Sequence, residues 1–216
     1  MKESGSASTL ETAFTSNERS STTRDSQFVR LALVGEAALA LFAVGLGRLL
    51  GISPLATLQP GWGALLWGLL ATPPLLLALL GILRTQEGPL RRLVEFVLGE
   101  LGPILARRSA PELALLAALA GLGEELLFRG LLQAGLMQVV PSSIALFSAS
   151  ALFGLAHFVT TSYAVVAGLM GLYLGALFLL QGNLFAPFVT HALYDFVALL
   201  LVVRRWRTSR AQPLSE

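Results

Sequence analysis

Long apolar segments constrain the fold of this chain more than any other feature. Of its 216 residues, 55% are hydrophobic and only 13% are charged, whereas about a quarter of the residues are charged in an average soluble domain. The apolar residues occur in runs long enough to cross a bilayer, not in short alternating segments. The sequence therefore predicts an all-α fold, a polytopic bundle of transmembrane helices.

Six apolar segments are candidates for transmembrane helices. Their approximate bounds are 28–50, 62–83, 112–137, 142–159, 164–180 and 184–203. Pro73 and Pro74 lie inside the second segment and predict a kink there, because proline removes a helix donor. Residues 89–109 mix leucines with charged side chains, which is typical of an amphipathic helix at the membrane surface.

The two ends of the chain are polar. Residues 1–27 are rich in serine and threonine and cannot bury enough apolar surface to offset their chain entropy, so we expect a disordered N-terminal tail. Residues 28–203 form the predicted transmembrane domain. Residues 204–216 form a basic C-terminal tail, which we interpret as a topology anchor and not as a nucleic-acid-binding segment. The chain has no cysteine, which excludes disulfides and thiolate catalysis.

Basic residues indicate the orientation of the bundle. Six spans place both termini on one side, together with the loop between the second and third spans, and these three segments are rich in arginine. The opposite loops, which include GISPLATLQPG and QGN, carry no basic residue. The positive-inside rule therefore predicts an integral membrane protein with both termini in the cytoplasm.

Ionisable side chains inside the spans are candidate functional residues, because burial of a charge in hydrocarbon costs about 2.5–3.5 kcal/mol or more. The spans contain Glu36, Arg48, Glu124, Glu125, Arg129, His157, His191 and Asp195. Glu36 and Arg48 lie toward opposite ends of the first span, and we interpret both as structural or pore-facing.

Helical spacing sorts the other charged residues. Glu125 and Arg129 are four residues apart, so they share a helix face and can form a structural ion pair. Glu124 is rotated by about 100° from its neighbour and stays available for chemistry.

The two histidines show the same spacing on two further spans. His157 follows Phe153 by four residues, and Asp195 follows His191 by four. Three helices thus each present a polar group in an apolar setting, and we expect Phe153 to pack against the site that they would form.

This set of side chains favours hydrolysis by one of two routes. A glutamate and a histidine can hold a water molecule and take its proton, while a second histidine stabilises the oxyanion that forms at a carbonyl. Alternatively, Glu124, His157, His191 and Asp195 hold a zinc ion that activates the water. The residues themselves leave both routes open.

Three motifs in this region resemble those of the CPBP family, also called the Abi family, which comprises CAAX prenyl proteases and bacteriocin-processing proteins. EELLFRG (124–130) resembles the family's EExxxR motif, and FGLAH (153–157) resembles FxxxH. HALYD (191–195) resembles the third motif, a histidine followed four residues later by Asn or Asp. The motifs occur in the family's order, and the resemblance covers about residues 112–203.

The resemblance implies a helical intramembrane endopeptidase, similar to type II CAAX prenyl proteases, with residues 112–203 as its catalytic core. Glu124 matches the catalytic glutamate, and His157 matches the histidine that helps to hold the attacking water. His191 matches the histidine on the oxyanion side, with Asp195 beside it. The family is often labelled metalloprotease, so Zn²⁺ is the cofactor that this resemblance would add.

Asp195 leaves three interpretations open. Where the eukaryotic-type enzymes carry Asn, the amide can donate a hydrogen bond to an oxyanion, whereas an ionised aspartate cannot and would repel it. Asp195 is therefore protonated, or it orients His191, or it ligates a metal.

The substrate follows less directly from the sequence. We interpret a cysteine-free chain with short loops as a protein of a bacterial inner membrane, and expect a peptide, a leader sequence or a membrane-protein segment as substrate. One alternative is a non-proteolytic bacteriocin-immunity or membrane partner-binding protein with the same fold. Another is an ion-conducting bundle, which would need polar groups across the whole membrane depth.

Reporter fusions test the predicted orientation. We expect a reporter at the C-terminus to be active in the cytoplasm and one in the loop near Pro141 to be active outside, because the arginines anchor their side of the bundle. A C-terminal reporter that is active only outside would contradict the arrangement with six spans.

Overall fold

The computed structural model describes residues 4–211, with side chains from residue 25 onward. Its longer helices are α1 (Ser4–Leu49), α2 (Trp62–Arg84), α3 (Gly88–Glu100), α5 (Ala110–Glu125), α7 (Ser142–Ala156), α8 (Thr161–Gln181) and α9 (Phe185–Ala211). Its short elements are the 3₁₀ helix η1 (Pro54–Thr57), α4 (Gly102–Leu105), the π-helix η2 (Leu126–Gln133) and α6 (Ala134–Leu136). The fold is all-α, as the apolar segments predict.

Among the described residues, four helices are long and apolar enough to cross a membrane: Asp25–Leu49 within α1, and α2, α8 and α9. The two other predicted spans are helical but fall short of that measure for different reasons. The third is divided among α5, η2 and α6, because the chain changes to a π-helix directly after Glu125. The fourth is α7, which has only 15 residues because it ends just before His157.

Both ends of the described chain are helical where the sequence predicted tails. Residues 4–27 form the beginning of α1 instead of a disordered tail, and residues 204–211 form the end of α9. Helix propagation adds one hydrogen bond for each residue that it fixes, and neither flank contains a proline, so both helices continue into polar sequence. Residues 1–3 and 212–216 lie outside the described part. The boundaries of the predicted domains therefore stay predictions.

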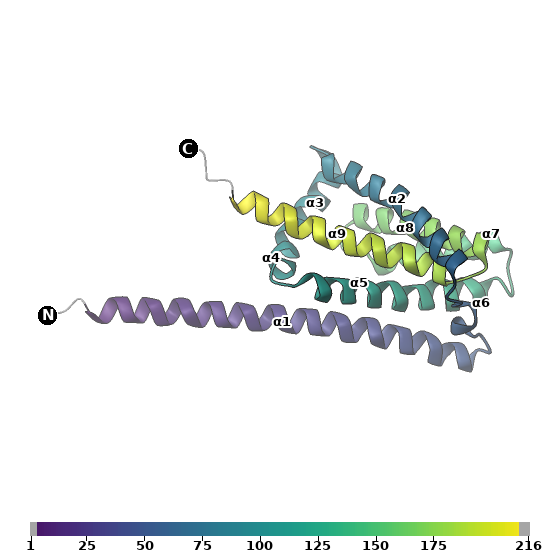
Figure 1. Ribbon diagram of the computed structural model, residues 1–216, viewed down its shortest axis with the longest axis horizontal. Helices are drawn as coiled ribbons and strands as arrows, with labels where there is room; N and C mark the ends of the chain where they lie inside the picture. The colour runs from purple at the N-terminus through teal and green to yellow at the C-terminus, as the bar shows by residue number, and fades with distance from the viewer. Residues whose placement is uncertain (1–3, 212–216) are drawn as a thin grey trace. The chain divides into compact units, whose positions relative to one another are not determined.

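The chain divides into two compact units, residues 1–35 and 36–216. In the first unit, the described residues form the N-terminal part of α1. In the second, α9 lies between α2 and α5, and α7 packs against α8 (Figure 1). One apolar cluster of this unit joins Ala43 to Leu126, Phe178 and Leu184. This cluster thus includes Leu126 of the first motif.

A close contact between α2 and α9 fixes the position of the third motif. Gly68 approaches α9 so closely that a Cβ atom there would lie 2.6 Å from Cβ of Val189. Thr190 donates a hydrogen bond from Oγ1 to the Gly68 carbonyl across this interface, at 3.0 Å. Val189 and Thr190 make these contacts and directly precede His191 in the chain. The contacts therefore fix the position and the rotation of that part of α9.

The helices α3 and α4 occupy the segment that we predicted to be amphipathic. On α3, Leu93 and Val94 are buried, whereas Arg92 and Glu95 are exposed. This division of one helix into an apolar and a charged face agrees with the predicted amphipathic helix. Its position at a membrane surface stays a prediction.

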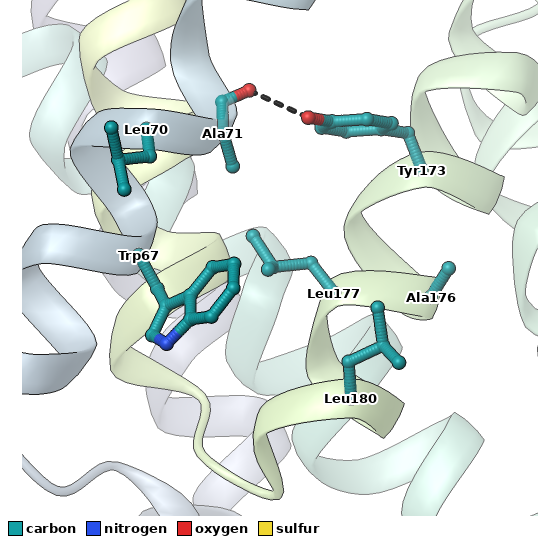
Figure 2. A pocket seen from close by; sticks show the side chains of 7 residues that line it. All are labelled: Trp67, Leu70, Ala71, Tyr173, Ala176, Leu177 and Leu180. Atoms are coloured by element: carbon teal, nitrogen blue, oxygen red, sulfur yellow. Dashed lines mark hydrogen bonds between the residues drawn. The ribbon is translucent and has the colours of Figure 1, made fainter.

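A cavity of about 240 Å³ lies between α2 and α8 (Figure 2). It is lined by Trp67, Leu70, Ala71, Tyr173, Ala176, Leu177 and Leu180. The Tyr173 hydroxyl donates to the carbonyl of Ala71 at 2.8 Å and so links the two helices. None of the residues of the three motifs lines this cavity, so the candidate active site lies elsewhere.

Candidate active site

The first motif lies at a change of helix type. Glu124 and Glu125 are the last two residues of α5, and Arg129 lies inside η2. π-Helical segments are rare and frequently occur at functional sites. The side chains of Glu125 and Arg129 are 0% and 1% exposed, and Arg129 Nη1 donates to Glu125 Oε1 at 2.8 Å. The ion pair that the spacing predicts is therefore present and fully buried.

This ion pair also contacts the other motifs. Arg129 Nη2 donates to the Gly171 carbonyl of α8 at 2.9 Å, and the guanidinium carbon lies 4.6 Å from the centre of the Phe153 ring. Glu125 Oε1 lies 2.9 Å from Nδ1 of His191. The spacing of the first motif alone predicted a structural pair, whereas the pair also orients a histidine of the site.

Glu124 lies between the two histidines. Its Oε1 is 3.6 Å from Nε2 of His157, and its Oε2 is 3.7 Å from Nε2 of His191. Asp195 Oδ2 lies 3.5 Å from the same Nε2 atom of His191. The four side chains are between 3% and 28% exposed. The structure thus brings together the residues that we predicted to be catalytic, although they come from three separate helices.

Hydrogen bonds at the Nδ1 atoms determine which nitrogen of each histidine carries hydrogen. His157 Nδ1 lies 2.8 Å from the carbonyl of Phe153, and His191 Nδ1 lies beside Glu125. A carbonyl and an ion-paired carboxylate only accept, so each Nδ1 must donate. In the neutral rings both Nε2 atoms are therefore acceptors, and they face a carboxylate. Separations of 3.5–3.7 Å exceed the usual length of a hydrogen bond, and a donor such as water suits this set.

Phe153 is the packing partner that the three motifs share. Its ring stacks on His157 with the centroids 4.5 Å apart, meets Phe128 edge to face at 4.9 Å, and lies 6.0 Å from His191. The side chain is 1% exposed. These contacts restrict the rotation of both imidazole rings and agree with the packing role that we expected for Phe153.

Glu36 lies at the site, although its position in the sequence did not indicate this. A Cβ atom on Gly123 would be 2.7 Å from the backbone oxygen of Glu36 and 3.5 Å from its Oε2. This Oε2 is buried and has no hydrogen-bond partner among the described residues. Its carboxylate interacts electrostatically with Glu124 and Asp195. Arg48, by contrast, is exposed near the end of α1.

Tyr163 is a second residue that sequence reasoning missed. Its ring meets His157 edge to face, with the centroids 5.8 Å apart and the planes at 87°. The only sequence signal is its position six residues after the second motif, on the far side of a short loop. This position indicates a contact with His157 only when the structure shows that the loop folds α8 back beside the second motif.

The placement of the ionisable side chains bears on the metal ion that the resemblance would add. Among residues 25–211, no group of three or more histidine, aspartate or glutamate side chains is placed to hold one. Glu124 presents a different oxygen to each histidine. The described residues thus give no support to the zinc ion that the family resemblance would add, and that ion stays a prediction.

Comparison with known proteins supports the same region of the chain. Residues 106–197 match the family model of the type II CAAX prenyl endopeptidase Rce1-like proteins. This match contains all three motifs and confirms the resemblance that they indicated. The uncharacterized protein YpbD of Bacillus subtilis (strain 168) is 33% identical over 97 residues, which are 44% of this chain and 47% of that protein. The chain thus spans about half the length of this curated relative. No solved structure matches the chain.

The buried ion pair leads to a prediction about stability. We expect Glu125→Gln to lower the free energy of unfolding by about 3–5 kcal/mol, because it leaves Arg129 charged and unpaired in the core. The control is Glu95→Gln, which breaks the exposed Arg91–Glu95 pair of the same spacing, at 2.7 Å, and should cost no more than about 1 kcal/mol. Unfolding in detergent measures both. Equal losses for the two variants would contradict the structural role of Glu125.

Proposed function

Since residues 106–197 match the Rce1-like family model of the CPBP family, we propose that this protein is an intramembrane endopeptidase. The observation that carries the proposal is the approach of Glu124 to both histidines, from three helices, in a largely buried setting. Ionisable groups inside a membrane bundle are costly and mark functional sites. A purely structural role for Glu124 would not explain why its two oxygens face the Nε2 atoms of two histidines.

The first chemical step is attack by water. A water molecule beside Glu124 Oε1 and His157 Nε2 donates one hydrogen to each atom. The carboxylate oxygen is an acceptor, and His157 Nε2 is an acceptor because the Phe153 carbonyl binds the hydrogen on Nδ1. Glu124 takes the proton as general base while the water oxygen forms a bond to the carbonyl carbon of the peptide. The carbonyl oxygen becomes the oxyanion of a tetrahedral intermediate.

The second step breaks the peptide bond. Glu124 returns its proton to the nitrogen of the leaving group, the C–N bond breaks, and the products are a carboxylic acid and an amine. We assign His191 and Asp195 to the side of the site where the oxyanion forms. Glu125 holds His191 in place through the bond to Nδ1, so the buried ion pair contributes to catalysis by positioning.

The proposed substrate is a peptide or a membrane-protein segment that reaches the site within the lipid bilayer. The proposed location is a bacterial inner membrane with both termini in the cytoplasm, which rests on the arginine-rich segments of one side. We propose no nucleic-acid partner. The competing function is a membrane partner-binding protein that keeps the fold without the chemistry.

A cleavage assay in detergent tests the role of Glu124. We expect Glu124→Gln to fold normally and to lower kcat by about 10²–10⁴-fold, because the amide cannot accept a proton from water. Glu95→Gln is the matched control and should keep the wild-type rate. A wild-type rate for Glu124→Gln would overturn the assignment, and a folded wild-type protein that cleaves nothing in a broad peptide screen would favour the partner-binding function.

Asp195→Asn separates the interpretations of Asp195. Asparagine keeps the shape and supplies a donor that needs no proton, so we expect activity to survive and to extend to higher pH. The measurement is a pH–rate profile of wild type and variant, each with and without a chelator. If the variant lost activity and added zinc restored it, Asp195 would be a metal ligand, and the water-only mechanism would be wrong.

A further inference from the structure

Among the residues of the three motifs, the side chains that can donate to an oxyanion do so only when they are protonated. In their neutral form both histidines accept at Nε2, because their Nδ1 atoms donate to Phe153 and Glu125. His191 can donate from Nε2 only when its ring is charged, and Asp195 can donate only when it is protonated. Hydrolysis of a peptide depends on a donor that is already in place when the oxyanion forms. A side chain that donates without a change in its protonation would therefore complete this cluster.

Tyr163 is held beside the cluster by the start of α8. The chain leaves α7 at His157 and enters α8 at Thr161, after a loop of only four residues. Thr160 caps α8, because its Oγ1 accepts a hydrogen bond from the Tyr163 N–H at 3.1 Å. The phenol ring then meets the edge of the His157 imidazole at 5.8 Å. The cap fixes the backbone of Tyr163, and the imidazole restricts its ring.

The Tyr163 hydroxyl is available as a donor. Tyr173 lies further along the same helix, α8. Its hydroxyl donates a hydrogen bond to the Ala71 carbonyl at 2.8 Å (Figure 2). In residues 25–211 no such partner binds the hydroxyl of Tyr163. The carboxylates of Asp195 and Glu124 both interact electrostatically with this hydroxyl, so it lies near the cluster.

We propose that Tyr163 is a further catalytic residue, whose hydroxyl donates a hydrogen bond to the oxyanion of the tetrahedral intermediate. The inference rests on the proposed endopeptidase function. No proton is transferred from Tyr163: its O–H bond stays intact, and the hydrogen bond strengthens as negative charge develops on the former carbonyl oxygen. Such donors act on the chemical step more than on substrate binding.

Tyr163→Phe tests the proposal because it removes only the hydroxyl and keeps the ring against His157. We expect kcat to fall by about 10²–10³-fold, with KM and the midpoint of thermal unfolding close to the wild-type values. Tyr173→Phe is the matched control on the same helix. It removes a hydroxyl with a structural partner, so it should lower the unfolding midpoint and leave kcat within about twofold of wild type, because catalysis does not depend on that hydroxyl.

Binding of a phosphinic peptide adds a readout that a structural role would not change. This tetrahedral anion imitates the oxyanion, so Tyr163→Phe should weaken its Kd by about 10²-fold and leave the Kd of the uncleaved peptide, measured in the Glu124→Gln background, unchanged. If cleavage depended on Glu124 but Tyr163→Phe had the same kcat as wild type, the role of Tyr163 would be wrong and the proposed function would stand. A wild-type protein that neither cleaves peptides nor binds the phosphinic peptide would overturn the proposed function and this inference together.

Discussion

The buried ion pair of Glu125 and Arg129 is the interaction on which the geometry of the site depends. It joins the end of α5 to η2, to the Gly171 carbonyl of α8 and to His191 of α9. Buried pairs of this kind contribute little net stability compared with well-packed apolar residues, and Glu125 Oε2 has no partner among the described residues. The value of the pair therefore lies in position: it fixes the tautomer and the rotation of the histidine that faces Glu124.

Two adjacent glutamates have different surroundings because a helix rotates by about 100° at each residue. Glu125 points into the core, where a guanidinium and an imidazole both bind it, and its side chain is 0% exposed. Glu124 points toward the two Nε2 atoms and keeps 13% exposure. One residue can thus be optimised for position and the next for proton transfer. A single carboxylate could not serve both purposes, since an oxygen held by Arg129 is a poorer base.

Sequence reasoning predicted the parts of this site that depend on helical spacing. The contact of Glu125 with Arg129, and that of Phe153 with His157, follow from a separation of four residues on one helix. Glu36 and Tyr163 could not be assigned in this way, because each meets the site across helices or a loop whose packing no local pattern encodes. The same limit applies to helix ends: the spans were predicted from hydropathy, which does not show that Glu125 ends an α-helix or that a polar flank continues one.

Water is a reactant in peptide hydrolysis, and the interior of a membrane contains little of it. The arrangement of acceptors in this site favours the binding of water. Glu124 and the two Nε2 atoms form a set that no direct hydrogen bond among them satisfies, and unsatisfied buried acceptors cost free energy. Entry of water into this set would remove that cost, so the groups to which we assign the activation of water would also favour its presence. Apolar side chains such as Phe153 close one side of the set. In the proposed mechanism, the site thereby retains a water molecule at the atom that takes its proton.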